Sequence, residues 1–227
     1  MNLLTLSQAV AQESRMMDPA LITAVAGATG QKADIINATA RAWTYIQNLE
    51  ANWKWQRADF SKTISSGDGI YTATDWSLTR WRRWITGDRA LSMYLTATGV
   101  SDEGALAWLE WSDFRLMYLR GTQTNNRPVH WTVSPDGSLY FGPVPDAGYT
   151  VKGEYMKSAQ TISADADTPE MPTDHHMLIA WRAVITLLGT EGSEQVEIGH
   201  ANFQYSEMLG NLRRDQLPSP MVGEALA

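Results

Sequence analysis

The stretch that decides the fold is residues 33–55, ADIINATARAWTYIQNLEANWKW. Its apolar side chains recur every three to four residues, which is the spacing of one face of an α-helix and not of a strand. These side chains are Ile35, Ile36, Ala40, Trp43, Ile46, Leu49, Ala51 and Trp53. The pattern predicts a core helix of about 20 residues, and such a helix spans roughly 30 Å. The small side chains of Ala38, Ala40 and Ala42 would let another helix approach closely.

Four other segments also have helical spacing. Residues 2–12 predict a short N-terminal helix, and a second helix is expected from Ser101 to Gly121. Residues 174–189 are apolar almost all round, so this helix is expected to be the most buried. A last helix is expected to open at Ser193.

Between these helices the pattern indicates β-strands. Two strands are expected around Gly67-Asp68-Gly69, and further extended segments at 80–85 and 92–95. Residues 128–133 and 139–141 flank Ser134-Pro135-Asp136-Gly137, which is typical of a hairpin. A third strand is expected at 149–155.

This layout predicts an α+β fold, a helical bundle with an inserted antiparallel β-rich region. One domain is expected over residues 1–214, followed by an extended C-terminal tail, 215–227, without fixed structure. The expected parts of the domain are a helical body (1–55, 101–120 and 173–214) and a β-rich insert (56–100 and 127–158).

Composition narrows the class of protein. The chain has 227 residues and no Cys, which excludes disulfides and thiolate catalysis and favours an intracellular or virion protein over a secreted scaffold. The N-terminal residues do not have the pattern of a signal peptide, and no run of 18 apolar residues predicts a membrane span.

Charge is distributed unevenly along the chain, whose net charge is −7. Residues 51–95 carry seven basic and four acidic side chains, whereas residues 159–227 carry three basic and ten acidic ones. Tight DNA binding depends on neutralising phosphates, so an acidic chain is a poor candidate for it. It suits a surface past which DNA slides.

Catalytic motifs are absent from the sequence. It contains neither a glycine-rich phosphate loop nor a GxSxG elbow. Asp174-His175-His176 is open to interpretation as a metal or acid/base cluster, but adjacent helical residues point about 100° apart, which favours polar residues at a helix start. Asp136, Asp146, Asp165 and Asp167 fit no calcium loop and are interpreted as turn residues.

Residues Arg80-Trp81-Arg82-Arg83-Trp84 form an aromatic and basic segment. Alternation on a strand would place the tryptophans on one side and guanidinium groups on the other. Such a patch can bind nucleic acid or carbohydrate. Alternatively, one face of the strand packs in the core, and the other face is solvated or pairs with acidic groups of a neighbouring protein. The acidic remainder of the chain favours a protein neighbour.

Several short motifs follow one another over nearly the whole chain, and none is specific alone. They are Leu4-Thr5-Leu6, Thr29-Gly30-Gln31, Ala42-Trp43, Ile46-Gln47, Phe114-Arg115, Tyr118, Arg127-Pro128, Trp131, Pro135-Asp136-Gly137, Gly142-Pro143, Pro145-Asp146, Gly153-Glu154-Tyr155, residues 164–169 and residues 176–183. In this order they resemble the adaptor proteins of tailed bacteriophages, also called head-to-tail connector or neck proteins.

The resemblance implies a non-enzymatic structural protein of the virion, without a cofactor, located at the head–tail junction and assembled in the host cytoplasm. Such proteins form a ring, typically of twelve copies, that docks on the portal protein. The ring carries tail, nozzle or tail-terminator proteins. Genomic DNA passes through its lumen without specific binding, and no membrane is involved.

The resemblance also assigns candidate site residues. The tail is expected to dock on the portal through Leu217, Pro218, Pro220, Met221 and Val222. The segment from Arg80 to Trp84 matches the family less clearly. The uneven charge, and not the resemblance, makes this segment a candidate contact between subunits. Two alternatives remain open: a carbohydrate-binding tail or capsid decoration protein, suggested by tryptophans in the β-rich part, and a hydrolase with a site near Asp174-His175-His176.

Overall fold

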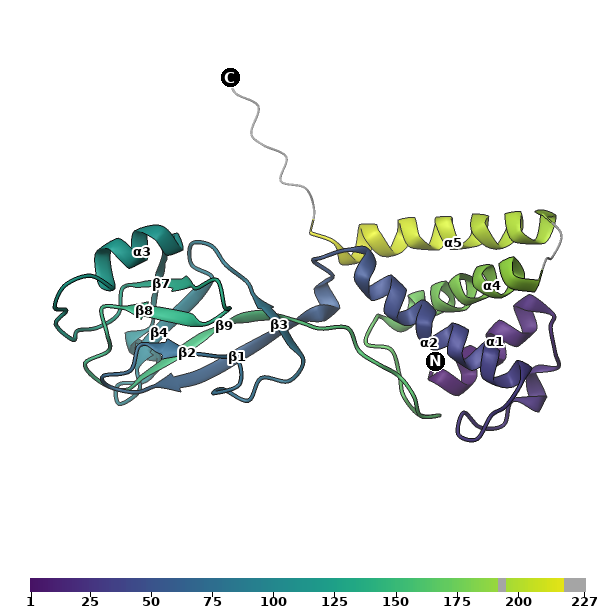
Figure 1. The fold of residues 1–227 in the computed structure, drawn as a ribbon, viewed down its shortest axis with the longest axis horizontal. Coiled ribbons are helices and arrows are strands. Elements are labelled where there is room, and N and C mark those ends of the chain that lie inside the picture. Colours follow the sequence, from purple (N-terminus) through teal and green to yellow (C-terminus); the bar gives the residue numbers. More distant parts are fainter. Residues whose placement is uncertain (192–194, 219–227) are drawn as a thin grey trace, which may run out of the picture. The chain divides into compact units, whose positions relative to one another are not determined.

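The computed structural model of the chain describes residues 1–191 and 195–218 and divides into two compact units (Figure 1). The first unit combines residues 1–56 with the chain from 159 onward, and it contains the long helices. The second unit is the continuous segment 57–158, which contains the strands and one short helix. The predicted α+β fold is therefore confirmed.

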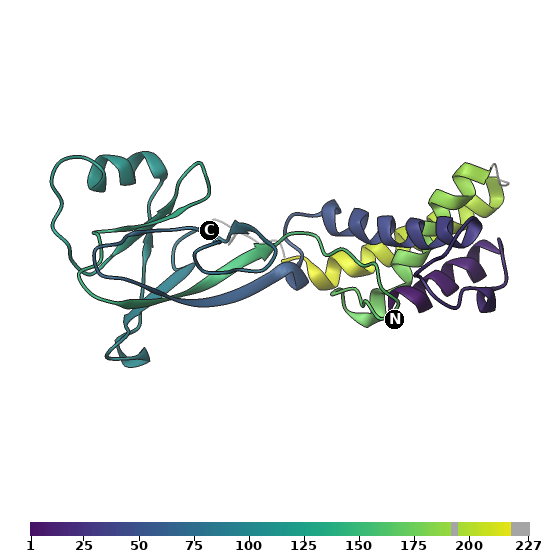
Figure 2. The ribbon, with the colours of Figure 1, turned by 60° about the horizontal axis from the view of Figure 1, so that its bottom comes forward.

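Four α-helices build the described part of the first unit. They are α1 (Leu3–Ser14), α2 (Gln31–Leu49), α4 (Met177–Glu191) and α5 (Gln195–Gln216), with short 3₁₀ turns η1 (Pro19–Leu21), η2 (Lys54–Gln56) and η4 (Thr173–His175). Helix α4 packs against α1, α2 and α5, as Figures 1 and 2 show. Its central position explains why its sequence is apolar on nearly every side. Leu178, Ile179 and Ala183 of α4 have no exposed surface.

Helix α2 is the predicted core helix, but it ends earlier than the spacing suggested. The backbone at Glu50 is extended (φ −128°, ψ 147°), and Trp53 and Trp55 lie in the turn that follows. Their rings stack at 4.4 Å, and Trp53 Nε1 donates to the carbonyl of Ile46 at 3.1 Å. The two tryptophans thus fold back on the last turns of the helix instead of extending it.

Nine strands belong to the second unit. They are β1 (Arg57–Ile64), β2 (Ile70–Tyr71), β3 (Trp81–Trp84), β4 (Leu91–Leu95), β5 (Gly104–Ala105), β6 (Ala107–Trp108), β7 (His130–Val133), β8 (Leu139–Gly142) and β9 (Tyr149–Lys157). One sheet has the order β1-β9-β4-β5, with β3 also paired to β9, and the other has the order β2-β8-β7-β6. Aromatic side chains fill the core of this unit, among them Phe60, Trp76, Trp84 and Phe141.

The strand pairing confirms one predicted hairpin and corrects another. Strands β7 and β8 pair antiparallel around the turn at 134–137, as predicted. Strands β1 and β2 flank Gly67-Asp68-Gly69 as predicted, but they do not pair with each other, because β1 pairs with β9 and β2 with β8. Pairing with partners far along the chain leaves no pattern in the local sequence.

The predicted helix from Ser101 to Gly121 is shorter than expected. Only α3 (Trp111–Tyr118) is α-helical, and it follows a 3₁₀ turn η3 (Val100–Asp102) and strands β5 and β6. Leu106 is buried in the aromatic core of the second unit, and α3 packs against β7. Residues 101–120 therefore belong to the second unit, and not to the helical body with which the sequence pattern grouped them.

Candidate interaction surfaces

The aromatic and basic segment 80–84 lies mainly on strand β3. Trp84 is buried, with 3% of its surface exposed, and its Nε1 donates to the carbonyl of Gly137 at 2.8 Å. Trp81 is partly buried and packs against the Trp84 ring at 5.5 Å. A bulge between Trp81 and Arg83 breaks the expected alternation, so that Arg82 and Arg83 are both exposed. The segment therefore presents arginines, not tryptophans.

The other tryptophans of the chain are also turned away from solvent. Each of the ten is buried or partly buried, and Trp43, Trp53 and Trp131 have no exposed surface at all. The suggestion of a carbohydrate-binding surface built on exposed tryptophans of the β-rich part is therefore wrong in its premise. Nine of the ten tryptophans contribute to the two cores, where large aromatic surfaces are most stabilising, and Trp111 packs against Tyr140 at 5.0 Å.

The C-terminal segment starts later than predicted. Helix α5 continues to Gln216, and Leu217 is partly buried against the helical core. Lys54 Nζ donates to the carbonyl of Asp215 at 2.6 Å, and Arg213 pairs with Glu50 at 2.8 Å. Of the candidate portal-docking residues, Leu217 and Pro218 lie among the described residues, whereas Pro220, Met221 and Val222 lie outside them.

Asp174, His175 and His176 do not converge on one site. The Nε2 of His176 lies 2.9 Å from the carbonyl of Met171, so it must carry the proton, and its Nδ1 accepts from the Met1 ammonium at 2.7 Å. Burial lowers the pKa of His176 below its ordinary value. His175 instead contacts the Asp215 carboxylate at 3.1 Å. Both imidazoles are thus occupied in joining segments of the helical unit.

The aspartates interpreted as turn residues likewise do not converge on one site. The Asp167 carboxylate accepts from the backbone N–H groups of Ser163 and Ala164, at 2.7 and 2.8 Å, and Asp165 accepts from Val25 at 2.7 Å. Asp136 accepts from Ser138 in the β7–β8 turn. Over residues 1–191 and 195–218, no three His, Cys, Asp or Glu side chains form a group able to hold a metal ion.

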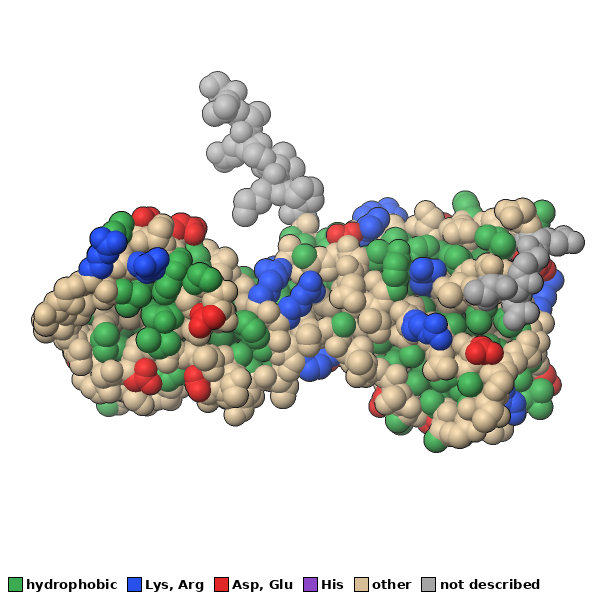
Figure 3. All heavy atoms as spheres, viewed as in Figure 1, with side chains coloured by type: hydrophobic (Ala, Val, Ile, Leu, Met, Phe, Trp, Pro, Cys, Tyr) green, Lys and Arg blue, Asp and Glu red, His purple; other side chains and the backbone are tan. Residues whose placement is uncertain are grey.

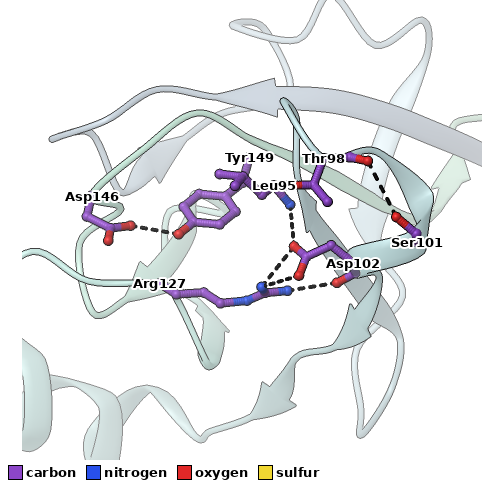
Figure 4. A network of polar contacts seen from close by, with 7 residues as sticks. All are labelled: Leu95, Thr98, Ser101, Asp102, Arg127, Asp146 and Tyr149. Atoms are coloured by element: carbon purple, nitrogen blue, oxygen red, sulfur yellow. Dashed lines mark hydrogen bonds and ion pairs between the residues drawn. The ribbon is translucent and has the colours of Figure 1, made fainter.

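A polar network that the sequence did not predict joins four segments of the second unit (Figure 4). Arg127 NH1 donates to both carboxylate oxygens of Asp102 at 2.8 Å, and its NH2 donates to the Asp102 carbonyl at 2.9 Å. The Leu95 N–H donates to the same carboxylate at 2.8 Å. Tyr149 lies beside the guanidinium and donates its hydroxyl to Asp146 at 2.7 Å.

These contacts shift two pKa values in opposite directions. The hydrogen bonds from Arg127 lower the pKa of Asp102, and the Leu95 N–H acts in the same direction. Burial raises the pKa of Tyr149 to about 12, and the acceptor Asp146 adds to this effect. Both groups therefore keep one protonation state at neutral pH, and the network holds segments together instead of exchanging protons. The local signals for it were the Arg127-Pro128 and Pro145-Asp146 motifs.

The outer face of the larger sheet carries a groove of about 720 Å³. Its lining residues include Asp59 on β1, Lys152 and Glu154 on β9, and Arg89 before β4. Lys152 pairs with Glu103 at 2.9 Å, and Arg57 lies 3.5 Å from Glu154. On the face of this unit drawn in Figure 3, acidic and basic side chains are interspersed with exposed hydrophobic ones. The lining of the groove itself combines these charged side chains with apolar ones such as Phe60 and Ile85.

The sequence was compared with models of known protein families and with curated proteins. The model of the family described as SU10 adaptor protein matches residues 1–223. A search of curated proteins found no match. Among the described residues, no helix is both long and apolar enough to cross a membrane.

Proposed function

Because the chain belongs to the SU10 adaptor protein family, a family of phage head-to-tail adaptors, we propose that it forms a ring that docks on the portal and carries tail or nozzle proteins. We further propose twelve copies in this ring, with genomic DNA passing through the lumen in the assembled virion. The observation that carries the proposal is the family match over residues 1–223. Membership of this family gives the chain a structural role in the phage.

Charge supports a lumen that does not bind DNA. The helical unit carries seven basic and fourteen acidic side chains, and the second unit carries eleven of each, so the whole net charge of −7 belongs to the helical unit. Few phosphates can be neutralised by such a chain, and duplex affinity at physiological salt should be weak.

The same distribution supports a contact between subunits at β3. Arg82 and Arg83 are exposed on a unit without net charge, whereas the helical unit of a neighbouring copy is acidic. Each exposed ion pair is worth only ~0–1 kcal/mol, but a cyclic assembly repeats the pair at every interface. In this proposal Trp81 and Trp84 position the strand from the core side and do not touch the neighbour.

Docking on the portal is assigned to the end of the chain. Leu217 and Pro218 follow the last turn of α5, and Pro220, Met221 and Val222 come after them in the sequence. Leu217 and Pro218 remain docking candidates, but Asp215 and Leu217 also contact the helical unit. A deletion that spares the fold must therefore start after Pro218.

The test mixes the purified chain with the portal ring of the same phage and counts bound copies by light scattering and electron microscopy. The intact chain should add as a ring of twelve, and deletion of residues 219–227 should abolish binding without changing the melting temperature. Charge reversal at Arg82 and Arg83 should weaken ring formation, and raised salt should have the same effect.

The matched control for that reversal is Arg115→Glu with Arg120→Glu, two exposed arginines of the α3 region in the same unit. Equal weakening by both double variants would show that only net charge matters. An intact chain that does not bind the portal would contradict the proposed function.

A further inference from the structure

Strand β1 stands at the end of its sheet, and one of its two edges is open. The sheet order is β1-β9-β4-β5, and β1 pairs with β9 over all eight of its residues without a register shift (Figure 1). Among the described strands it is the longest one at a sheet edge. The other end strands, β2, β5 and β6, have two residues each, and β3 has four residues and a bulge.

The direction of the open backbone groups follows from the contacts of β9. The carbonyl of Glu154 accepts from Ile85, and that of Gly148 accepts from Thr96, so the even-numbered residues of this stretch point toward β3 and β4. Backbone groups alternate in direction along a strand. The odd-numbered residues of β9 therefore point toward β1, where their partners are Ala58, Phe60, Lys62 and Ile64.

It follows that the N–H and C=O groups of Arg57, Asp59, Ser61 and Thr63 point away from β9. All four of these residues are exposed, and among the described residues no hydrogen bond reaches their outward backbone groups. An open edge of this length is a template for pairing with another chain. Folded proteins protect such edges with proline, bulges, very short strands or charged side chains. Strand β1 has only the charged side chains, Arg57, Asp59 and Lys62, which leave its outward backbone groups open.

We propose that the open edge of β1 binds an extended segment of a neighbouring virion protein, which adds to the sheet as a further strand. The proposal rests on the proposed function, because that function supplies the neighbouring proteins. Backbone hydrogen bonds would provide the affinity, as in other cases of strand addition. Asp59 and Ser61 also line the charged groove on the outer face, so polar side chains of the added strand would reach that groove.

A second copy of the chain fits this edge less well. Its described end strands of two residues cannot match an eight-residue edge. Two β1 strands could pair with each other, but that contact has two-fold symmetry and joins only two copies. A ring instead requires a head-to-tail contact between different surfaces of neighbouring copies.

Proline substitutions separate the open edge from the paired one. Ser61→Pro removes only an outward N–H, and proline is tolerated on an edge strand when its missing N–H faces solvent. Lys62→Pro is the matched control, because it removes an N–H bonded to β9. We expect Ser61→Pro to fold with a melting temperature close to that of the parent chain but to lose the neighbouring protein from assembled particles. Lys62→Pro should instead lower the melting temperature.

Hydrogen exchange on the parent chain tests the pairing directly. In particles of the phage that encodes this chain, exchange at the amides of Asp59, Ser61 and Thr63 should slow at least tenfold relative to the free chain. A photo-crosslinking residue at Thr63 should then capture a different virion protein. Unchanged exchange, or capture of a second copy alone, would overturn the inference while leaving the adaptor role intact. Absence of the parent chain from the particles would overturn the proposed function and this inference together.

Discussion

Arg127 shows how one side chain can hold together segments that are distant in sequence. Its guanidinium binds Asp102 in the η3 turn, the same carboxylate accepts from the end of β4, and Tyr149 at the start of β9 lies beside it. Paired donors on a planar guanidinium match the two oxygens of a carboxylate, which makes the contact directional as well as electrostatic. The residues before β7 are thus anchored by a single arginine.

At this scale we predict that Arg127→Gln reduces the loss of stability in acid. The pKa of Asp102 is lowered in the folded chain. The ionised carboxylate therefore adds to the stability of the fold above the ordinary aspartate pKa of about 3.9, and this stabilisation is lost as pH falls through the lowered value. Melting temperatures between pH 7 and pH 3 should therefore fall less steeply for the variant. Arg120→Gln, at an exposed position, is the control, and parallel curves for the variant and the parent chain would contradict the assignment.

At the scale of elements, α5 differs from the other long helices in how little of it is buried. Over 22 residues only Ala201 and Leu212 are buried, while Val196 and Phe203 are 78% and 64% exposed. They lie on the side of the helix opposite Ile198, Tyr205 and Leu212. The apolar spacing of α5 therefore combines two faces, and only one of them packs within the unit.

This division predicts opposite outcomes for two substitutions in the same helix. Leu212→Ala should cost about 2–5 kcal/mol in the free energy of unfolding, because it leaves a cavity in the helical core. Phe203→Ala should change that free energy by less than about 0.5 kcal/mol, because its ring is mostly in solvent. Denaturant titration of the monomeric chain measures both. A large cost at Phe203 would show that the ring is buried in solution.

At the scale of the whole molecule, the second unit is one uninterrupted piece of chain whose ends lie together. Arg57 pairs with Met156 in the β1–β9 ladder, so the chain enters and leaves the unit on neighbouring strands. The unit also has its own aromatic core, separate from the helical one. These are the properties of an insertion that can fold alone.

We therefore predict that residues 57–158, expressed without the rest of the chain, fold cooperatively. Circular dichroism in the near ultraviolet should report ordered tryptophans, and thermal unfolding should be a single reversible transition. The same fragment carrying Trp84→Ala serves as the control, since loss of this buried ring should weaken the core. A fragment of the natural sequence that lacks fixed tertiary structure would show that the helical unit is needed to complete the fold.

Local patterns allowed some elements to be predicted and not others. The helical period at 33–55 and the turn residues at 134–137 determine their elements through neighbours within a few residues. The hairpin was predicted correctly, and so was the helix except for its end, which lies at Leu49. The period of residues 101–120 also resembled a helix, but Leu106 is buried against strands and not against the other helices. Of the candidate contacts, the alternation of residues 80–84 predicted neither the bulge that exposes both Arg82 and Arg83 nor the hydrogen bond of Trp84 to the distant residue Gly137.

The sequence by itself determined the fold class, the core helix and, through the colinear order of its motifs, the adaptor family. It did so because helical periodicity, turn chemistry and motif order are properties of neighbouring residues or of their succession. Only the tertiary structure decided that the molecule has two cores, that Arg127 meets Asp102, and that one edge of β1 is open. These features depend on which strands pair and on which side chains meet across long stretches of chain, and such contacts leave no periodic trace in the sequence.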